Sequence, residues 1–226
     1  TWRVINEIIG KKTDPHLKDE FTLNGNRITD TSDYATSFNS FFSNIGPQLA
    51  SKINNENNVH FTNFLSEPFE RSLFFNPTNP NEIINITKSM NPSKSQGHDK
   101  ISTSLLKEII HFIANPLTDV FNKSILLGIC PNILKIAKVT PIYKKDDPHE
   151  MSNYRPISIL SSISKILERI IYNRLCNFLN IHKILNPNQY GFRKNHSTDL
   201  ALIQIYDKIT NALANKEQVI GIFLDF

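Results

Sequence analysis

Three basic side chains in the middle of the sequence have the types and the spacing to bind a polyphosphate. Lys144 and Lys145 end a short run rich in β-branched and aromatic residues, and Arg155 begins a second such run. The residues between the runs are turn formers, so the simplest structure for Val139–Leu160 is a β-hairpin with a long tip. Antiparallel pairing would bring the ammonium and guanidinium groups to one end of a ribbon, where they could hold phosphate groups. The alternative interpretation is a solvated, charged hairpin tip.

A carboxylate near the end of the sequence is the second candidate for chemistry. Asp225 lies in an apolar run, and we expect a buried strand over Val219–Phe226. A carboxylate at the end of such a strand is a frequent ligand of a hard cation such as Mg²⁺. Asp225 could be the first acid of a two-metal polymerase, a phosphatase nucleophile or a Walker-B acid. The Walker-B interpretation needs the loop G-x-x-x-x-G-K-[ST], which the sequence lacks. A phosphatase would need another acid shortly after Asp225 and a phosphate-binding loop elsewhere.

Two other polar segments are interpreted as structural. Ser93–Ile101 is a turn with one glycine before a helix. Such a turn can hold phosphate, but Asp99 would repel an anion, so a structural turn is favoured. Asp146 and Asp147 lie beside lysines in the predicted hairpin tip and are interpreted as a solvated turn rather than a metal site. The histidines lack the spacing of metal ligands.

The elements that must position these residues form a mostly helical α+β pattern with a β-hairpin. Short strands are expected in a hairpin over Phe21–Ile28 and at Arg71–Phe75, and residues 54–60 are expected to form a linker. Three phenylalanines at near-helical spacing predict a core rather than a platform for stacking bases. Periodicity and capping residues predict helices over residues 2–10, from a cap at Asp30 or Thr31 through Leu49, from Asn79 through Met90, from Leu105 to Ile113, from Pro116 to Leu127, from Ser161 to Asn180 and from a cap at Ser197 or Thr198 to about Ala214.

The composition permits several classes of function. The chain has 226 residues, of which 39% are hydrophobic and 20% are charged, enough for one good core or two small ones. A formal net charge of +4 permits nucleic acid as a partner without requiring it. The sequence has no apolar run of about 18 residues, so we expect no membrane span. Two cysteines cannot form a metal cluster alone, and an intracellular, reducing compartment is the default.

Several blocks of the sequence together resemble a known family. In order they are Val139–Asp147, Asn153–Leu160, Ser164–Glu168, Asn188–Thr198 and Phe223–Phe226, with a further block upstream at Ser95–Ile101. They resemble the reverse transcriptases of non-LTR retrotransposons (LINE-like elements) and span about residues 90–226. Group II intron and telomerase reverse transcriptases are the alternatives within the class, and the sequence Tyr154-Arg-Pro-Ile-Ser favours the LINE-like group. Residues 1–80 resemble the segment that joins an upstream endonuclease to the polymerase.

The resemblance implies a right-hand polymerase fold. Residues 1–80 would be the connector, and residues 81–226 would be the fingers with the first strand of the palm. The implied activity is that of an RNA-directed DNA polymerase, which copies retrotransposon RNA into DNA by two-metal nucleotidyl transfer with Mg²⁺. The partners would be an RNA template, a DNA primer and a dNTP, and the enzyme would be intracellular, and nuclear when it acts on chromosomal DNA.

The resemblance also assigns roles to single residues. Lys144 or Lys145, together with Arg155, would contact the triphosphate of the incoming dNTP. Arg193, in the block Gly191-Phe192-Arg193, would buttress the fingers and face the template. Asp225 would be the first metal-binding and catalytic aspartate, and Phe226 would lie beside the nucleotide. We therefore expect the guanidinium of Arg155 and the carboxylate of Asp225 to face a shared cleft.

One part of the family pattern is missing from the sequence. The second catalytic acid pair, in an aromatic-x-Asp-Asp block, would lie beyond Phe226. The start without methionine and the end within a strand pattern suggest a fragment. We expect this fragment to be inactive by itself. The alternative is a remnant that binds nucleic acid without catalysis.

Overall fold

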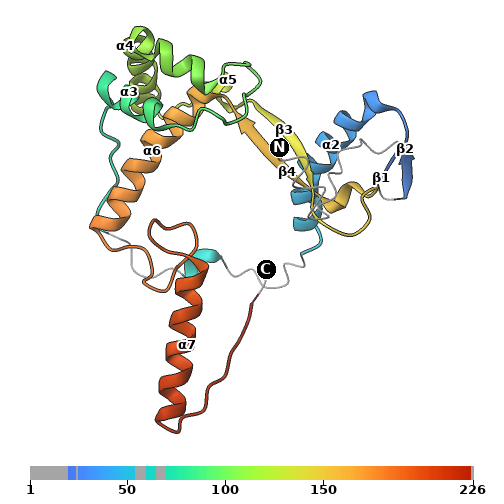
Figure 1. Ribbon diagram of the computed structural model, residues 1–226, viewed down its shortest axis with the longest axis vertical. Coiled ribbons are helices and arrows are strands. Elements are labelled where there is room, and N and C mark those ends of the chain that lie inside the picture. Colours follow the sequence, from blue (N-terminus) through green and yellow to red (C-terminus); the bar gives the residue numbers. More distant parts are fainter. Residues whose placement is uncertain (1–19, 24, 54–59, 65–69, 225–226) are drawn as a thin grey trace, which may run out of the picture. The chain divides into compact units, whose positions relative to one another are not determined.

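A computed structural model describes residues 20–23, 25–53, 60–64 and 70–224 (Figure 1). The predicted helix over residues 2–10, most of the predicted linker, Asp225 and Phe226 lie outside the described residues. The mixture of helices and small antiparallel sheets confirms the α+β class. The right-hand arrangement of fingers and palm stays a prediction. The elements are β1 (Phe21–Leu23), β2 (Asn26–Ile28), α2 (Thr31–Ala50), η1 (Phe61–Phe64), α3 (Pro80–Ser89), α4 (Thr103–Leu127), α5 (Asn132–Lys135), β3 (Ala137–Tyr143), η2 (Met151–Asn153), β4 (Tyr154–Leu160), α6 (Ser162–Ile181) and α7 (Thr198–Ala214).

The chain divides into two compact units, which are described separately. The first contains Thr1–Ser72 and Asn76–Ile170, and the second contains Leu73–Phe75 and Ile171–Phe226. The first unit therefore contains both hairpins and the first half of α6. The division into a connector over residues 1–80 and a polymerase segment over residues 81–226 stays a prediction about function.

Helices α3, α4 and the first half of α6 form the main core of the first unit. Full burial of an aliphatic or phenylalanine side chain contributes about 1.5–3 kcal/mol, so this cluster is the main source of stability in the unit. The predicted cap at Asn79 is confirmed, since its side chain accepts a hydrogen bond from the Glu82 amide at 3.0 Å. The buried cluster consists of Ile83, Ile86, Leu106, Ile110, Phe121, Ile166, Leu167 and Ile170.

Helix α4 corrects the prediction of two helices separated at Pro116. The structure has a single helix over Thr103–Leu127 with Pro116 inside it. Its buried residues Leu106, Ile110, Ala114, Thr118 and Phe121 keep a helical spacing across the proline, which is itself exposed. A continuous buried face can outweigh the local cost of a proline in a helix. The predicted end is confirmed, because Gly128 adopts the left-handed conformation with φ 66°.

Strands β3 and β4 form the predicted hairpin (Figure 1). The register pairs Pro141 with Pro156. The amide of Lys144 donates to the carbonyl of Asn153 at 2.8 Å, which continues the ladder one pair beyond the strands. Because hydrogen-bonded and non-hydrogen-bonded pairs alternate, the two prolines form a non-hydrogen-bonded pair. They therefore remove no bond between β3 and β4, and they hinder pairing of either outer edge with another strand.

The first predicted hairpin and the helix after it are also confirmed. β1 pairs with β2 around Gly25, which has φ 81°. Asp30 caps α2 by accepting a hydrogen bond from the Ser32 amide at 2.9 Å. Two of the three phenylalanines of α2 belong to a core as predicted, since Phe38 is buried and Phe42 packs against a second hydrophobic cluster. Phe41 is half-buried and lies against the ring of Phe42. That cluster consists of Phe21, Tyr34, Phe38 and Met151.

Two predicted strands are wrong. Arg71–Phe75 is irregular, and so are the described residues of the last predicted strand, Val219–Leu224, which are also exposed. Neither segment pairs with a strand among the described residues, and a lone apolar run without a ladder or a covering layer does not form a sheet. In the second unit, α7 is confirmed with its cap at Ser197, although none of its residues is buried.

Candidate functional site

The register of the β3–β4 hairpin determines which basic side chains share a face. Ile142 lies opposite Arg155, and Lys138 lies opposite Ile159, so these residues lie on one face of the ribbon. Lys144 is two residues beyond Ile142 and continues the ladder, which places it on the same face. We call it the cationic face. Lys145 instead lies in the turn, with its Nζ atom 4.0 Å from an Asp146 carboxylate oxygen.

The two basic residues at the tip end of the cationic face are available to a ligand. Lys144 and Arg155 are both exposed. Neither side chain makes a hydrogen bond or an ion pair with the part of the chain that the structure describes. Desolvating them for a ligand therefore breaks no internal ion pair. A guanidinium and an ammonium group on one face of a short ribbon can together contact several phosphate oxygens.

A pocket of about 760 Å³ lies against the same face. The hairpin forms one side of it, with Ile142, Ile157 and Ile159 as apolar lining, and the turn before α4 forms the other side. Three lysines line it, Lys94 and Lys100 from the turn and Lys138 from β3, and none of the described carboxylates does. We call it the lysine-lined pocket. Its charge suits a phosphate group, and its isoleucines suit the apolar face of a base or sugar.

The turn is held against the hairpin by a close contact at its glycine. Gly97 is buried, and a Cβ atom there would lie 2.7 Å from both the Cα and the nitrogen of Ser161. Only glycine allows this approach of two backbones without a shift. Asp99 is engaged inside the turn, where its Oδ1 atom accepts a hydrogen bond from the Ile101 amide at 3.2 Å. The predicted turn is present, and two of its lysines line the pocket.

The carboxylates at the hairpin tip are engaged in local contacts. Asp147 Oδ1 lies 2.9 Å from both the amide nitrogen and the ring Nδ1 atom of His149. Glu150 Oε1 accepts a hydrogen bond from the hydroxyl of Thr22 at 2.6 Å. Among the described residues, no group of three or more histidine, cysteine, aspartate or glutamate side chains could hold a metal ion. Asp146 and Asp147 lie between β3 and η2, in the hairpin tip as predicted.

Arg193 stabilises its own loop in the second unit. Its Nη1 atom donates to the carbonyl of Asn186 at 2.9 Å and to that of Gln189 at 3.4 Å. The neighbouring Phe192 is fully exposed and has φ 59°. The loop therefore presents an aromatic ring on a backbone conformation that non-glycine residues seldom adopt. Contact of Arg193 with a template stays a prediction.

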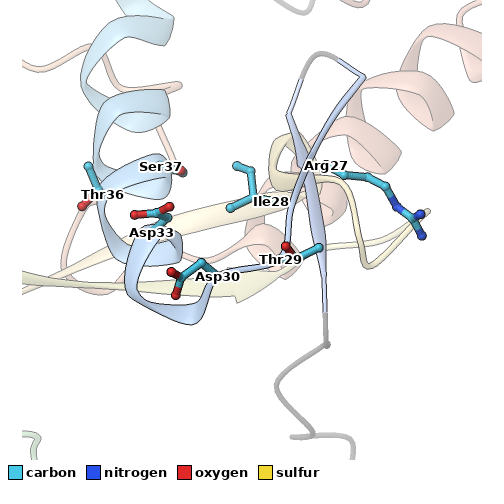
Figure 2. A pocket seen from close by; sticks show the side chains of 7 residues that line it. All are labelled: Arg27, Ile28, Thr29, Asp30, Asp33, Thr36 and Ser37. Carbon is cyan, nitrogen blue, oxygen red and sulfur yellow. The ribbon is translucent and has the colours of Figure 1, made fainter.

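A second pocket, of about 320 Å³, lies where β2 leads into α2 (Figure 2). We call it the acid-lined pocket, because Asp30 and Asp33 line it. The hydrogen bond from the Ser32 amide stabilises the ionised form of Asp30 and lowers its pKa. Figure 2 shows the guanidinium of Arg27 turned away from both aspartates, and its Nη2 atom donates to Glu20 at 2.6 Å. This pocket is unsuited to phosphate.

Known proteins are similar to this chain in sequence. Residues 142–226 match the sequence profile of the family described as reverse transcriptase (RNA-dependent DNA polymerase). The probable RNA-directed DNA polymerase from transposon BS of Drosophila melanogaster is 34% identical over 162 residues. The chain is homologous to the reverse transcriptases of non-LTR retrotransposons. The match with the transposon BS polymerase covers 71% of this chain and 18% of that relative.

Two further homologues from the same fly support the family. The RNA-directed DNA polymerase from mobile element jockey is 31% identical over 72% of this chain and 18% of its own length. The probable RNA-directed DNA polymerase from transposon X-element is 32% identical over 71% of this chain and 18% of its own length. The chain thus spans less than a fifth of the length of these reverse transcriptases.

Two site residues of the reverse transcriptase pattern are not placed. Asp225 and Phe226 lie outside the described residues, so the predicted approach of Arg155 to Asp225 stays a prediction. The described residues offer no cluster of side chains that fits Mg²⁺. None of the helices in the described part of the chain is long and apolar enough to cross a membrane.

The sequence reasoning missed the lysine-lined pocket, because its two sides are far apart in the chain. Lys94 and Lys100 lie about forty residues before the β3 strand that faces them. The usable signal was the spacing of basic residues on alternate strand positions, since Lys138, Lys144 and Arg155 then fall on one face. Nothing in the sequence near Gly97, apart from the predicted turn, indicated its close contact with the backbone of Ser161.

Proposed function

We propose that this chain supplies the nucleotide-binding and template-binding face of an RNA-directed DNA polymerase that copies retrotransposon RNA into DNA. The observation that carries the proposal is the cationic face. Lys144 and Arg155 are exposed at its tip end, and Lys138, on the same face, lines the lysine-lined pocket. The homology to reverse transcriptases supports the reaction class. The partners would be an RNA template, a DNA primer and a dNTP.

Different residues of the cationic face would bind the dNTP triphosphate and the phosphates of a nucleic acid strand. Arg155 would bind the dNTP triphosphate with its planar fork, and Lys144 would add a point charge from the same face. The lysines of the pocket would contact phosphates of a strand that lies along the hairpin. When bound, Mg²⁺ would neutralise charge on the triphosphate, and Asp225 would be one of its ligands.

We also propose a role for each of the two predicted segments and a cellular location for the enzyme. Residues 1–80 would connect an upstream endonuclease to the polymerase, and residues 81–226 would form the fingers and the start of the palm. Work on chromosomal DNA would place the enzyme in the nucleus. Residues 1–226 alone would incorporate no dNTP in a primer-extension assay, because the sequence contains no aromatic-x-Asp-Asp block.

A comparison of two alanine variants tests the nucleotide site. Hydrogen bonds to charged groups contribute about 1.5–3 kcal/mol, so Arg155→Ala should weaken dTTP binding about tenfold or more. Lys208→Ala, on exposed α7 in the second unit, should leave the affinity unchanged. Isothermal titration of the purified chain with dTTP measures both. Equal effects of the two substitutions would contradict the proposed role of Arg155.

The second candidate function is a remnant that binds nucleic acid without catalysis. The lysine-lined pocket favours it, because every residue of that pocket lies in the first unit and needs nothing from Asp225. Primer extension by a chain continued through the following codons separates the two functions. Incorporation that depends on Asp225 supports the polymerase, and RNA binding without incorporation supports the remnant.

A further inference from the structure

The tip of the β3–β4 hairpin contacts a segment more than one hundred residues earlier in the chain. Met151 lies in an otherwise polar tip, yet it is fully buried in a cluster with Phe21, Tyr34 and Phe38. The ring of Tyr154 joins the cluster, with centroids 5.7 Å from Phe21 and 5.3 Å from Phe38 in edge-to-face geometry. Burial of this size at a loop tip indicates a specific docking contact.

Hydrogen bonds from β1 fix the same contact. The amide of Thr22 donates to the carbonyl of His149 at 2.8 Å, and its hydroxyl donates to Glu150 Oε1 at 2.6 Å. Thr22 and Glu150 also form an isolated parallel bridge. The tip is thus held by backbone, by side-chain and by apolar contacts, which together define one orientation.

The docking contact lies on the side of the ribbon opposite to the cationic face. Tyr154 pairs with Tyr143, whereas the next residue, Arg155, pairs with Ile142 and points to the other face. The hydroxyl of Tyr154 donates to the carbonyl of Pro148 at 2.7 Å, which ties the ring to the tip. The cluster therefore packs against the face of the ribbon opposite to the cationic face, at the end where Lys144 and Arg155 lie.

We propose that β1, together with Tyr34 and Phe38 of α2, acts as a brace that positions Lys144 and Arg155 for a triphosphate, with Met151 as the central positioning residue. An isolated two-stranded hairpin is only marginally stable in water. Without the brace, the tip would open and the two basic groups would lose their shared orientation, so a ligand would have to restore it on binding. The inference rests on the proposed function for its ligand, but the brace itself can be measured without one.

Substitutions of the two methionines test the brace in the full 226-residue chain. Met151→Ala leaves a cavity behind the tip, whereas Met151→Leu keeps the volume and should behave like the wild type. Met90→Ala is the matched control, because Met90 packs against the helical core cluster instead. Thr22→Val is a second test that removes only the hydroxyl donor and keeps the shape, in case Met151→Ala prevents folding.

Hydrogen exchange and tripolyphosphate affinity are the two readouts. We expect Met151→Ala to speed exchange of the Lys144 amide about tenfold and to weaken tripolyphosphate binding several-fold, with Thr22→Val in the same direction. Met90→Ala should leave both unchanged. Unchanged tip exchange in Met151→Ala and Thr22→Val, or an equal change in Met90→Ala, would overturn the brace. If the wild type binds no tripolyphosphate, the proposed function fails, and the exchange rates still decide on the brace.

Discussion

The lysine-lined pocket and the acid-lined pocket lie in the same unit, and each has an arginine on an adjoining strand, but the two arginines are in opposite situations. Arg27 is paired with Glu20 at 2.6 Å and turns away from its pocket. Arg155 is exposed and makes no ion pair with the described part of the chain. An exposed ion pair such as Arg27–Glu20 contributes little energy, so the charges that line each pocket matter more: two aspartates line the acid-lined pocket, and three lysines line the other.

The acidic residues of the two surfaces differ in the same way. In the acid-lined pocket, Asp30 is used to cap α2, and Asp33 follows in the first turn, where a negative charge favours the helix. Beside the lysine-lined pocket, Asp99 is turned into its own loop. The charged side chains that line the lysine-lined pocket are all basic, whereas the acid-lined pocket has two aspartates and Arg27. The lysine-lined pocket is therefore the better complement to a nucleic acid strand.

The largest effect is expected from a substitution at Gly97, which lines the lysine-lined pocket. Gly97→Ala should lower the free energy of unfolding by about 3 kcal/mol, because the new Cβ meets backbone atoms rather than a flexible side chain. Chemical denaturation followed by circular dichroism measures the change. Gly46→Ala is the control, since nothing lies within 4 Å of a Cβ there, and its effect should stay within about 1 kcal/mol. Similar values for both would mean that Gly97 does not fix the turn.

The charge of the pocket should be visible in binding to single-stranded RNA. Replacing Lys94, Lys100 and Lys138 together by alanine should weaken binding about tenfold at low salt. The slope of log K against log salt should fall by about 2, since each phosphate contact to a single strand contributes about 0.7. Fluorescence anisotropy over a salt series measures both quantities. Arg27→Ala should change neither, and an unchanged slope in the triple variant would contradict the pocket as a strand site.

The smallest effect concerns the cap in the acid-lined pocket. The hydrogen bond from Ser32 lowers the pKa of Asp30 in the folded chain. The stability that ionised Asp30 adds to the folded chain is therefore complete above the ordinary aspartate pKa. It is lost as the pH falls through the lowered pKa of Asp30 in the folded chain. Thermal unfolding of the wild type should show this loss, and Asp30→Asn, which keeps a capping oxygen, should lack that component. Identical pH profiles would contradict the assignment.

Local signals in the sequence predicted much of the fold. The caps at Asp30, Asn79 and Ser197, the helix end at Gly128 and both hairpins are confirmed. Each depends on a few adjacent residues whose side chains satisfy backbone groups or permit a turn. The same is true of the hairpin that carries the candidate site.

Features that depend on distant partners were not predictable in this way. Pro116 suggested a helix boundary, but the buried face of α4 runs through it. Val219–Leu224 has the composition of a strand, and the described residues provide no strand to pair with it. The brace was missed as well, although Met151 was a usable signal, being an apolar residue in a polar tip. Whether Arg155 faces Asp225 depends on a contact between distant segments and stays a prediction.

A titration of the ¹⁵N-labelled chain with dTTP, followed by heteronuclear NMR, tests the central claim most directly. The account predicts shifts at the amides of Lys144 and Arg155 and of their neighbours on the cationic face, with little change around Asp30 and along α7. Saturable shifts confined to the acid-lined pocket or to α7, or no shifts at millimolar dTTP, would contradict the claim that the cationic face of the β3–β4 hairpin binds the triphosphate.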